Sequence, residues 1–185
     1  MNVCNECQGK RLCLPVKANF SIEPRYALLV GEAMIIYARY EGTIVDIISF
    51  YKNGYREGYY CHEMLQPSNL VSDLKSISDK KYPGVISSLA DNFQQAVYIR
   101  NAICHSVTCG GKDGFDVFLF QTGAIKRGRK EPLKNLNPYR NTTFNESLLM
   151  KLADKMSRDE QEASKYFYEL RNRYNSGERF LGQPC

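Results

Sequence analysis

Apolar residues recur at every third or fourth position along much of the chain, and this spacing predicts helices. The first such stretch begins at Pro24, a residue suited to the first turn of a helix, and ends near Asn53-Gly54. Its second half contains the β-branched run Thr43-Ile44-Val45, which weakens a helix unless the residues are buried. We therefore expect one long helix here, with a buried second half.

Two more helices are expected before residue 110. Ser68 is a candidate N-cap for a short segment that stops before Lys80-Lys81. The next segment starts near Val85 and keeps a helical period up to the region of His105. Gly110-Gly111 supplies the backbone freedom that ends helices, so this helix should terminate just past His105.

A β-hairpin and a last helix are expected in the second half of the chain. The run from Phe115 to Phe120 favours a strand, and Thr122-Gly123 favours a turn into a second strand that contains the basic residues. Thr143 and Glu146 have the spacing of a capping box, and the apolar stripe after them continues for about 30 residues to Gly177. The sequence thus predicts a mainly α protein.

The size and composition are those of one folded domain, with 185 residues, 43% of them hydrophobic and 24% charged. We expect a cysteine-containing arm over residues 1–22, a helical domain over 23–177 and a C-terminal tail over 178–185. No apolar run approaches the roughly 18 residues of a membrane span, and the first residues lack the pattern of a signal peptide. We therefore expect a cytoplasmic protein without membrane contact, whose seven cysteines are reduced.

The positive charge is concentrated in one segment. Between residues 121 and 140 there are six basic residues and one acidic residue, a surplus that equals the net charge of +5 for the whole chain. A localised positive patch attracts a phosphate backbone, so we take Lys126, Arg127, Arg129 and Lys130 as candidate nucleic-acid-binding residues. The alternative is a solvated loop that only keeps the protein soluble.

Arg100, Asn101 and His105 are the candidate catalytic residues. The chain has only two histidines, and His105 is expected at a helix C-terminus, where the helix dipole favours its protonated form. On a regular helix, side chains five residues apart point roughly 140° away from each other. Arg100 and His105 therefore converge on one ligand only if the last turn is distorted, or if a two-fold dimer brings a second pair into the same groove. We favour the dimer.

The string of Arg100-Asn101, three further residues and His105 resembles the R-x4-6-H motif of HEPN domains. These are helical domains of bacterial defence and toxin–antitoxin systems, and of some eukaryotic ribonucleases. The motif's place at the end of a helix, after a long first helix and before a long last one, extends the resemblance over about residues 24–175. The fold that it implies is a HEPN-like antiparallel helical bundle with a small β-hairpin insertion.

In the catalytic members, the resemblance implies metal-independent RNA cleavage in a groove between two protomers, without a cofactor. Arg100 would hold the scissile phosphate and stabilise the charge that develops on it. His105 would act as general base or acid on the 2′-hydroxyl or the leaving oxygen, and Asn101 would orient His105 or the phosphate. The expected partners are then RNA, a second copy of the chain and an antitoxin or defence protein.

Each candidate residue has a structural alternative. Arg100 can pair with a carboxylate such as Asp91 or Glu146, and His105 can donate to a carbonyl at the helix end. A non-catalytic HEPN-like module that binds RNA or a protein is therefore the competing function. Val107 stands where toxins paired with a nucleotidyltransferase antitoxin commonly have a tyrosine, so that form of regulation is not expected here.

Cysteines near the N-terminus are the candidate metal ligands. Cys4, Cys7 and Cys13 offer three thiolates to zinc, with Cys61 or His62 as a fourth ligand. Only one pair of these cysteines has the tight spacing that is typical of zinc sites. We expect a reduced arm without a metal, and a structural zinc adaptor is the third alternative function.

Overall fold

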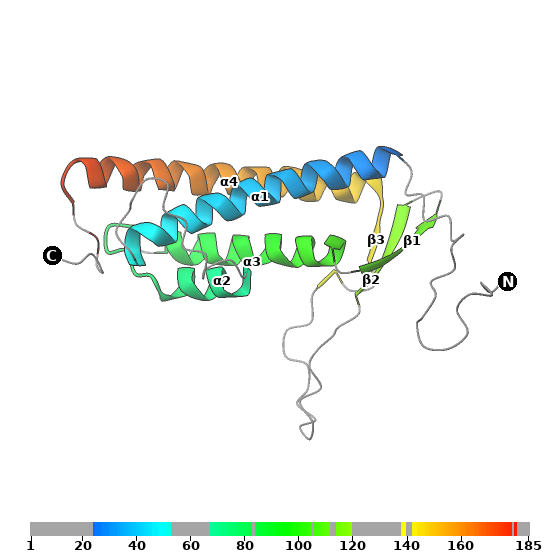
Figure 1. Cartoon of the computed structure of the whole chain (residues 1–185), viewed down its shortest axis with the longest axis horizontal. Coiled ribbons are helices and arrows are strands. Elements are labelled where there is room, and N and C mark those ends of the chain that lie inside the picture. Colours follow the sequence, from blue (N-terminus) through cyan, green and yellow to red (C-terminus); the bar gives the residue numbers. More distant parts are fainter. Residues whose placement is uncertain are drawn as a thin grey trace, which may run out of the picture.

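The computed structural model describes residues 24–52, 67–82, 84–104, 106–111, 114–119, 138–139, 142–178 and 180. These residues form, in chain order, α1 Pro24–Lys52, α2 Pro67–Ser76, α3 Val85–Cys104, β1 Ser106–Gly111, β2 Gly114–Leu119, β3 Thr142–Phe144 and α4 Glu146–Asn175 (Figure 1). The protein is mainly helical, as the spacing of its apolar residues predicts. Within these ranges, no helix combines the length and the apolarity that crossing a bilayer requires.

The helices begin and end close to the predicted positions. α1 ends one residue before Asn53-Gly54, and α3 begins at Val85. The β-branched half of α1 is buried, since Ile44, Ile47 and Ile48 have no exposed surface. Burial of these side chains therefore offsets their weaker helix propensity, as expected.

α1 and α4 pack along their whole length and run parallel. Arg25, near the start of α1, pairs with Glu146 at the start of α4 at 3.5 Å, and Arg39 pairs with Glu160 further along at 3.3 Å. α3 runs in the opposite direction beside them (Figure 1). Successive long helices are therefore antiparallel, as expected. With 10 residues, α2 is too short to span the bundle. The three long helices α1, α3 and α4 therefore alternate in direction, and α1 and α4 point the same way.

Aromatic rings join the three long helices. Phe93 of α3 meets Tyr40 of α1 edge-on, with ring centroids 5.3 Å apart, and stacks on Tyr37 at 6.1 Å. Phe50 of α1 packs against Phe167 of α4 at 5.8 Å. The largest side chains with under 2% exposure are Tyr40, Phe50, Phe93, Phe144, Ile44, Ile47, Ile48, Leu70, Leu74, Ile99, Leu149 and Met156.

A three-stranded antiparallel sheet lies at the end of the bundle where α3 ends and α4 begins (Figure 1). The strand order is β1-β2-β3, with Phe115 of β2 opposite Phe144 of β3. One expectation is wrong here. Gly110-Gly111 belongs to β1 and does not end α3, which stops at Cys104. β2 pairs with β1, which precedes it, and with β3, whereas the strand expected after Thr122-Gly123 lies outside the described residues.

The cap of α4 differs from the expected one. Asn145 is the N-cap, and its Oδ1 accepts a hydrogen bond from the backbone N–H of Leu148 at 2.8 Å. Thr143, which the capping-box spacing favours, lies in β3 opposite Asp116. At the other end Gly177 has a φ of 89°, the left-handed conformation that glycine permits and that ends helices.

Two residues beyond position 177 pack on the helices. Phe180 is 6% exposed, and its ring centroid lies 5.7 Å from that of Phe50 and 5.4 Å from that of Tyr51. Glu178 accepts a hydrogen bond from Nε of Arg173 at 2.9 Å. Part of the segment expected as a tail is therefore integral to the helical domain.

Candidate functional site

Arg100 and Asn101 lie near the C-terminal end of α3, and both are half-buried. Nη1 of Arg100 donates a hydrogen bond to Oδ1 of Asn101 at 3.1 Å. The amide oxygen thereby helps to orient the guanidinium, a group that can bind a phosphate. The two carboxylates considered as structural partners of Arg100 are paired elsewhere, Asp91 with a lysine of α2 and Glu146 with an arginine of α1.

The end of α3 packs against the middle of α1. Sγ of Cys104 donates to Sδ of Met34 at 3.7 Å, and nearly one turn further along α1 the hydroxyl of Tyr37 donates to Glu41 at 3.0 Å. Burial and the charge of Glu41 raise the pKa of Tyr37, whereas the charge of Arg100 lowers it. The positive charge of Arg100 therefore influences the hydroxyl of Tyr37 in α1.

His105 follows α3 directly. The helix ends at Cys104 and β1 begins at Ser106, so His105 stands between two elements and outside the described residues. The structure thus brings together Arg100 and Asn101, with His105 four residues after Asn101 in the sequence.

The other candidate residues also lie outside the described part of the chain. They are the basic residues Lys126, Arg127, Arg129 and Lys130 and the possible zinc ligands Cys4, Cys7, Cys13, Cys61 and His62. Among the described residues, no group of three or more histidine, cysteine, aspartate or glutamate side chains is placed to hold a metal ion.

A buried ionic network, which sequence reasoning missed, lies at the opposite end of the bundle from Arg100. Oδ2 of Asp79, in the connection between α2 and α3, accepts hydrogen bonds from Tyr51 of α1 and from Tyr166 and Arg173 of α4, each at 2.7 Å. Arg173 also donates to Glu178. Since these donors and acceptors satisfy one another, we assign the network a structural role.

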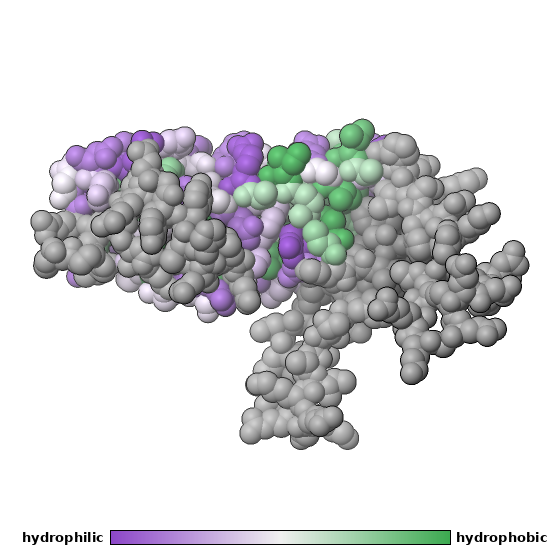
Figure 2. Space-filling view, viewed as in Figure 1, coloured by the Kyte–Doolittle hydropathy of each residue, from purple (hydrophilic) through white to green (hydrophobic). Residues whose placement is uncertain are grey.

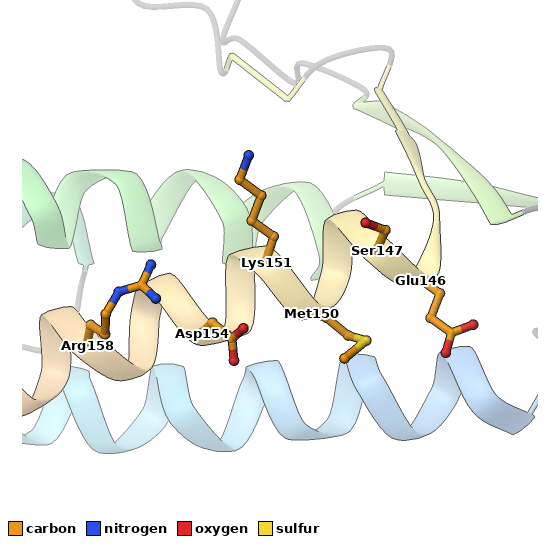
Figure 3. Close-up of a pocket in the computed structure, with 6 residues that line it drawn as sticks. All are labelled: Glu146, Ser147, Met150, Lys151, Asp154 and Arg158. Carbon is orange, nitrogen blue, oxygen red and sulfur yellow. The ribbon is translucent and has the colours of Figure 1, made fainter.

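A shallow pocket of about 520 Å³ lies on the N-terminal half of α4. Its lining residues are Glu146, Ser147, Met150, Lys151, Asp154 and Arg158 (Figure 3). Acidic and basic side chains alternate along this one helix, and none of the candidate catalytic residues is among them. The pocket is therefore separate from the site at the end of α3.

No protein-family model, no curated protein and no solved structure matches the chain. The resemblance to HEPN domains accordingly depends on Arg100, Asn101 and His105 and on the place of this segment at the end of a helix.

Proposed function

We propose that the chain is a metal-independent endoribonuclease of HEPN type, which cleaves RNA in a groove shared by two copies of the chain and acts in bacterial defence or toxin–antitoxin growth control. The observation that supports the proposal is the hydrogen bond between Arg100 and Asn101 near the end of α3, with His105 four residues after Asn101 in the sequence. A guanidinium oriented by an amide, with an imidazole close by in the chain, is suited to phosphodiester chemistry.

The proposed reaction uses the RNA's own 2′-hydroxyl as nucleophile. His105 accepts the hydroxyl proton, the 2′-oxygen bonds to phosphorus, and the bond from phosphorus to the 5′-oxygen breaks. The leaving 5′-oxygen takes up a proton from the second histidine of the dimer or from water. Arg100, held by Asn101, neutralises the charge that builds up on the phosphoryl oxygens. The products are a 2′,3′-cyclic phosphate and a 5′-hydroxyl end.

The basic segment has the complementary task of holding the RNA strand. Lys126, Arg127, Arg129 and Lys130 neutralise backbone phosphates without reading the base sequence. RNA binding should therefore weaken as salt concentration rises, whichever sequence is used.

The double variant Arg100→Ala/His105→Ala tests the proposal. Purified protein is incubated with mixed single-stranded RNA in the presence of EDTA, and cleavage is followed on a gel. Removal of the guanidinium and the imidazole should lower the cleavage rate by roughly 100-fold or more, with an unchanged helical circular dichroism spectrum. Fragments from the unaltered protein should have cyclic phosphate ends.

The control is the double variant Arg158→Ala/His62→Ala, which removes the same two residue types elsewhere and should cleave at the normal rate. Equal cleavage by Arg100→Ala/His105→Ala and the unaltered protein would contradict the proposal. RNA binding without cleavage by any of these proteins would instead favour a non-catalytic binding module.

A further inference from the structure

α1 presents an exposed apolar face to solvent. Leu28 is 75% exposed and Ile35 is 65% exposed, and Figure 2 shows apolar surface gathered over the N-terminal half of this helix. Gly31, Ala38 and Gly42 lie on the same face, because at about 100° per residue these five positions fall within an arc of about 80°. The large residues of this face are apolar, and its small residues leave shallow gaps in the helix surface.

Neither glycine of this face is required by a close contact within the described part of the chain. A Cβ added at Gly31 or Gly42 would meet no atom within 4 Å. Glycine inside a helix is less favourable than alanine, and one reason to keep it there is the close approach of another backbone. The glycines and the exposed Leu28 and Ile35 together indicate a partner that packs closely on α1.

We infer that this partner is a second copy of the chain, docked so that the two α1 helices are antiparallel about a two-fold axis at Ile35. In such a pair each position faces the position equally far on the other side of residue 35. Leu28, seven residues before Ile35, then faces Gly42 of the partner subunit, seven residues after it. A large exposed side chain meets the gap left by a glycine, and the symmetry makes this contact twice.

The charges beside the face agree with this direction. Glu32 and Arg39 are both exposed and lie on the same flank of the face. The antiparallel pair places Glu32 beside Arg39 of the partner subunit, whereas a parallel pair would separate the two charges by roughly 10 Å along the helix axis. Arg39 pairs with Glu160 at 3.3 Å, and its guanidinium has enough donors to bind a second carboxylate.

This inference deepens the proposed function and depends on it for its biological meaning, because the same dimer gives both copies of the candidate site one groove. Met34, which contacts Cys104 at the end of α3, is the neighbour of Ile35 in the sequence. The two-fold axis of an antiparallel pair keeps the same flank of both helices on one side. Both α3 ends therefore lie on one side of the pair and near the axis, whereas a parallel pair would put them on opposite sides.

Ile35→Glu tests the interface, because it places two carboxylates face to face at the axis. Sedimentation equilibrium at micromolar concentration should give a dimer for the unaltered protein and a monomer for this variant, with the same circular dichroism spectrum. Tyr168→Glu, at an apolar residue of α4 that is 59% exposed, is the matched control and should remain a dimer. A monomeric unaltered protein would overturn the inference, and so would a dimeric Ile35→Glu variant.

Cysteine cross-linking tests the direction of the helices. Oxidation of a mixture of the Leu28→Cys and Gly42→Cys proteins should form a disulfide between positions 28 and 42 of different chains, identified by peptide mapping. A disulfide between two copies of position 28 would show parallel helices and overturn the inference. The unaltered protein, with its seven cysteines, gives the background of native cross-links.

Neither measurement uses RNA, so the two proposals fail separately. A dimer with the 28–42 disulfide and no RNA cleavage would leave the interface standing and contradict the ribonuclease. RNA cleavage by a monomeric protein would overturn the interface and the shared groove while leaving the roles of Arg100 and His105 intact.

Discussion

Asp79 is a charged residue that the fold keeps away from water. Its side chain is 2% exposed, and burial alone would raise the pKa of its carboxyl. Hydrogen bonds donated by Arg173, Tyr166 and Tyr51 outweigh burial and hold that pKa well below its usual range. The carboxylate is therefore charged in the folded protein at neutral pH, and its stabilising effect comes from these donors.

Asp79→Asn should lower the free energy of unfolding at neutral pH by about 3 kcal/mol, because it deprives the buried guanidinium of Arg173 of one of its two carboxylates. Urea denaturation measures this loss. Asp91→Asn is the control, since the side chain of Asp91 is 70% exposed and its pair with Lys75 should contribute less than about 1 kcal/mol. Equal losses in the two variants would contradict a stabilising role for the buried network.

The same carboxyl sets part of the pH dependence of stability. A carboxyl whose pKa is lower in the folded than in the unfolded protein stabilises the fold. This contribution to the free energy of unfolding is complete above the unfolded pKa and is lost as pH falls towards the folded pKa. The stability difference between the unaltered protein and Asp79→Asn should thus stay constant from about pH 7 to about pH 5 and shrink below about pH 4. A stability difference that grew as pH fell would contradict a stabilising role for the charged Asp79 carboxylate.

Arg100 and Asp79 show which single residues the sequence identifies. Arg100 and Asn101 are neighbours in a short motif, so the sequence alone can single them out as candidates, and the structure joins them by a hydrogen bond. Asp79 lies 28 residues from Tyr51 and 94 residues from Arg173. Contacts over such separations exist only after the helices have packed, and no local pattern marks them in the sequence.

The start of α4 gives a test at the level of one element. Asn145→Ala should lower the free energy of unfolding by about 1 kcal/mol, because the backbone N–H of Leu148 loses its acceptor at the helix N-terminus. Thr143→Ala alters the residue that the capping-box spacing favours and should cost less, since that residue lies in β3. Chemical denaturation of both variants compares the two caps. A larger loss for Thr143→Ala would indicate that Thr143, and not Asn145, is the N-cap of α4.

Helices were predictable where strands were not, because helical contacts are local. The three-to-four-residue period marked the bounds of α1 and the start of α3 within a few residues. β1 contains Gly110-Gly111, a pair that favours a turn, and becomes a strand by pairing with β2. Strand propensity depends on the neighbouring strand, so the sequence indicated the end of a helix at a place where the fold forms a sheet.

At the scale of the whole molecule, the parallel direction of α1 and α4 was the main feature that local patterns did not reveal. Chain direction depends on how many helices span the bundle, and α2, with 10 residues, does not span it. The consequence is functional as well as architectural. α1 and α4 begin at the end of the bundle that holds the sheet and the candidate site, and both finish at the end closed by the Asp79 network.

Phe180 closes that second end and gives the last test. Phe180→Ala should lower the free energy of unfolding by about 3 kcal/mol, because it opens a cavity beside Phe50 and Tyr51 and admits water to Arg173, whose guanidinium carbon lies 4.9 Å from the centre of the Phe180 ring. Tyr168→Ala, at an exposed ring, should change stability by less than about 0.5 kcal/mol. Well below the unfolding midpoint, Phe180→Ala should keep the RNA cleavage rate of the unaltered protein, since Arg100 lies at the other end of the bundle. A cleavage rate that fell in the folded variant would mean that the two ends are coupled through the parallel helices α1 and α4.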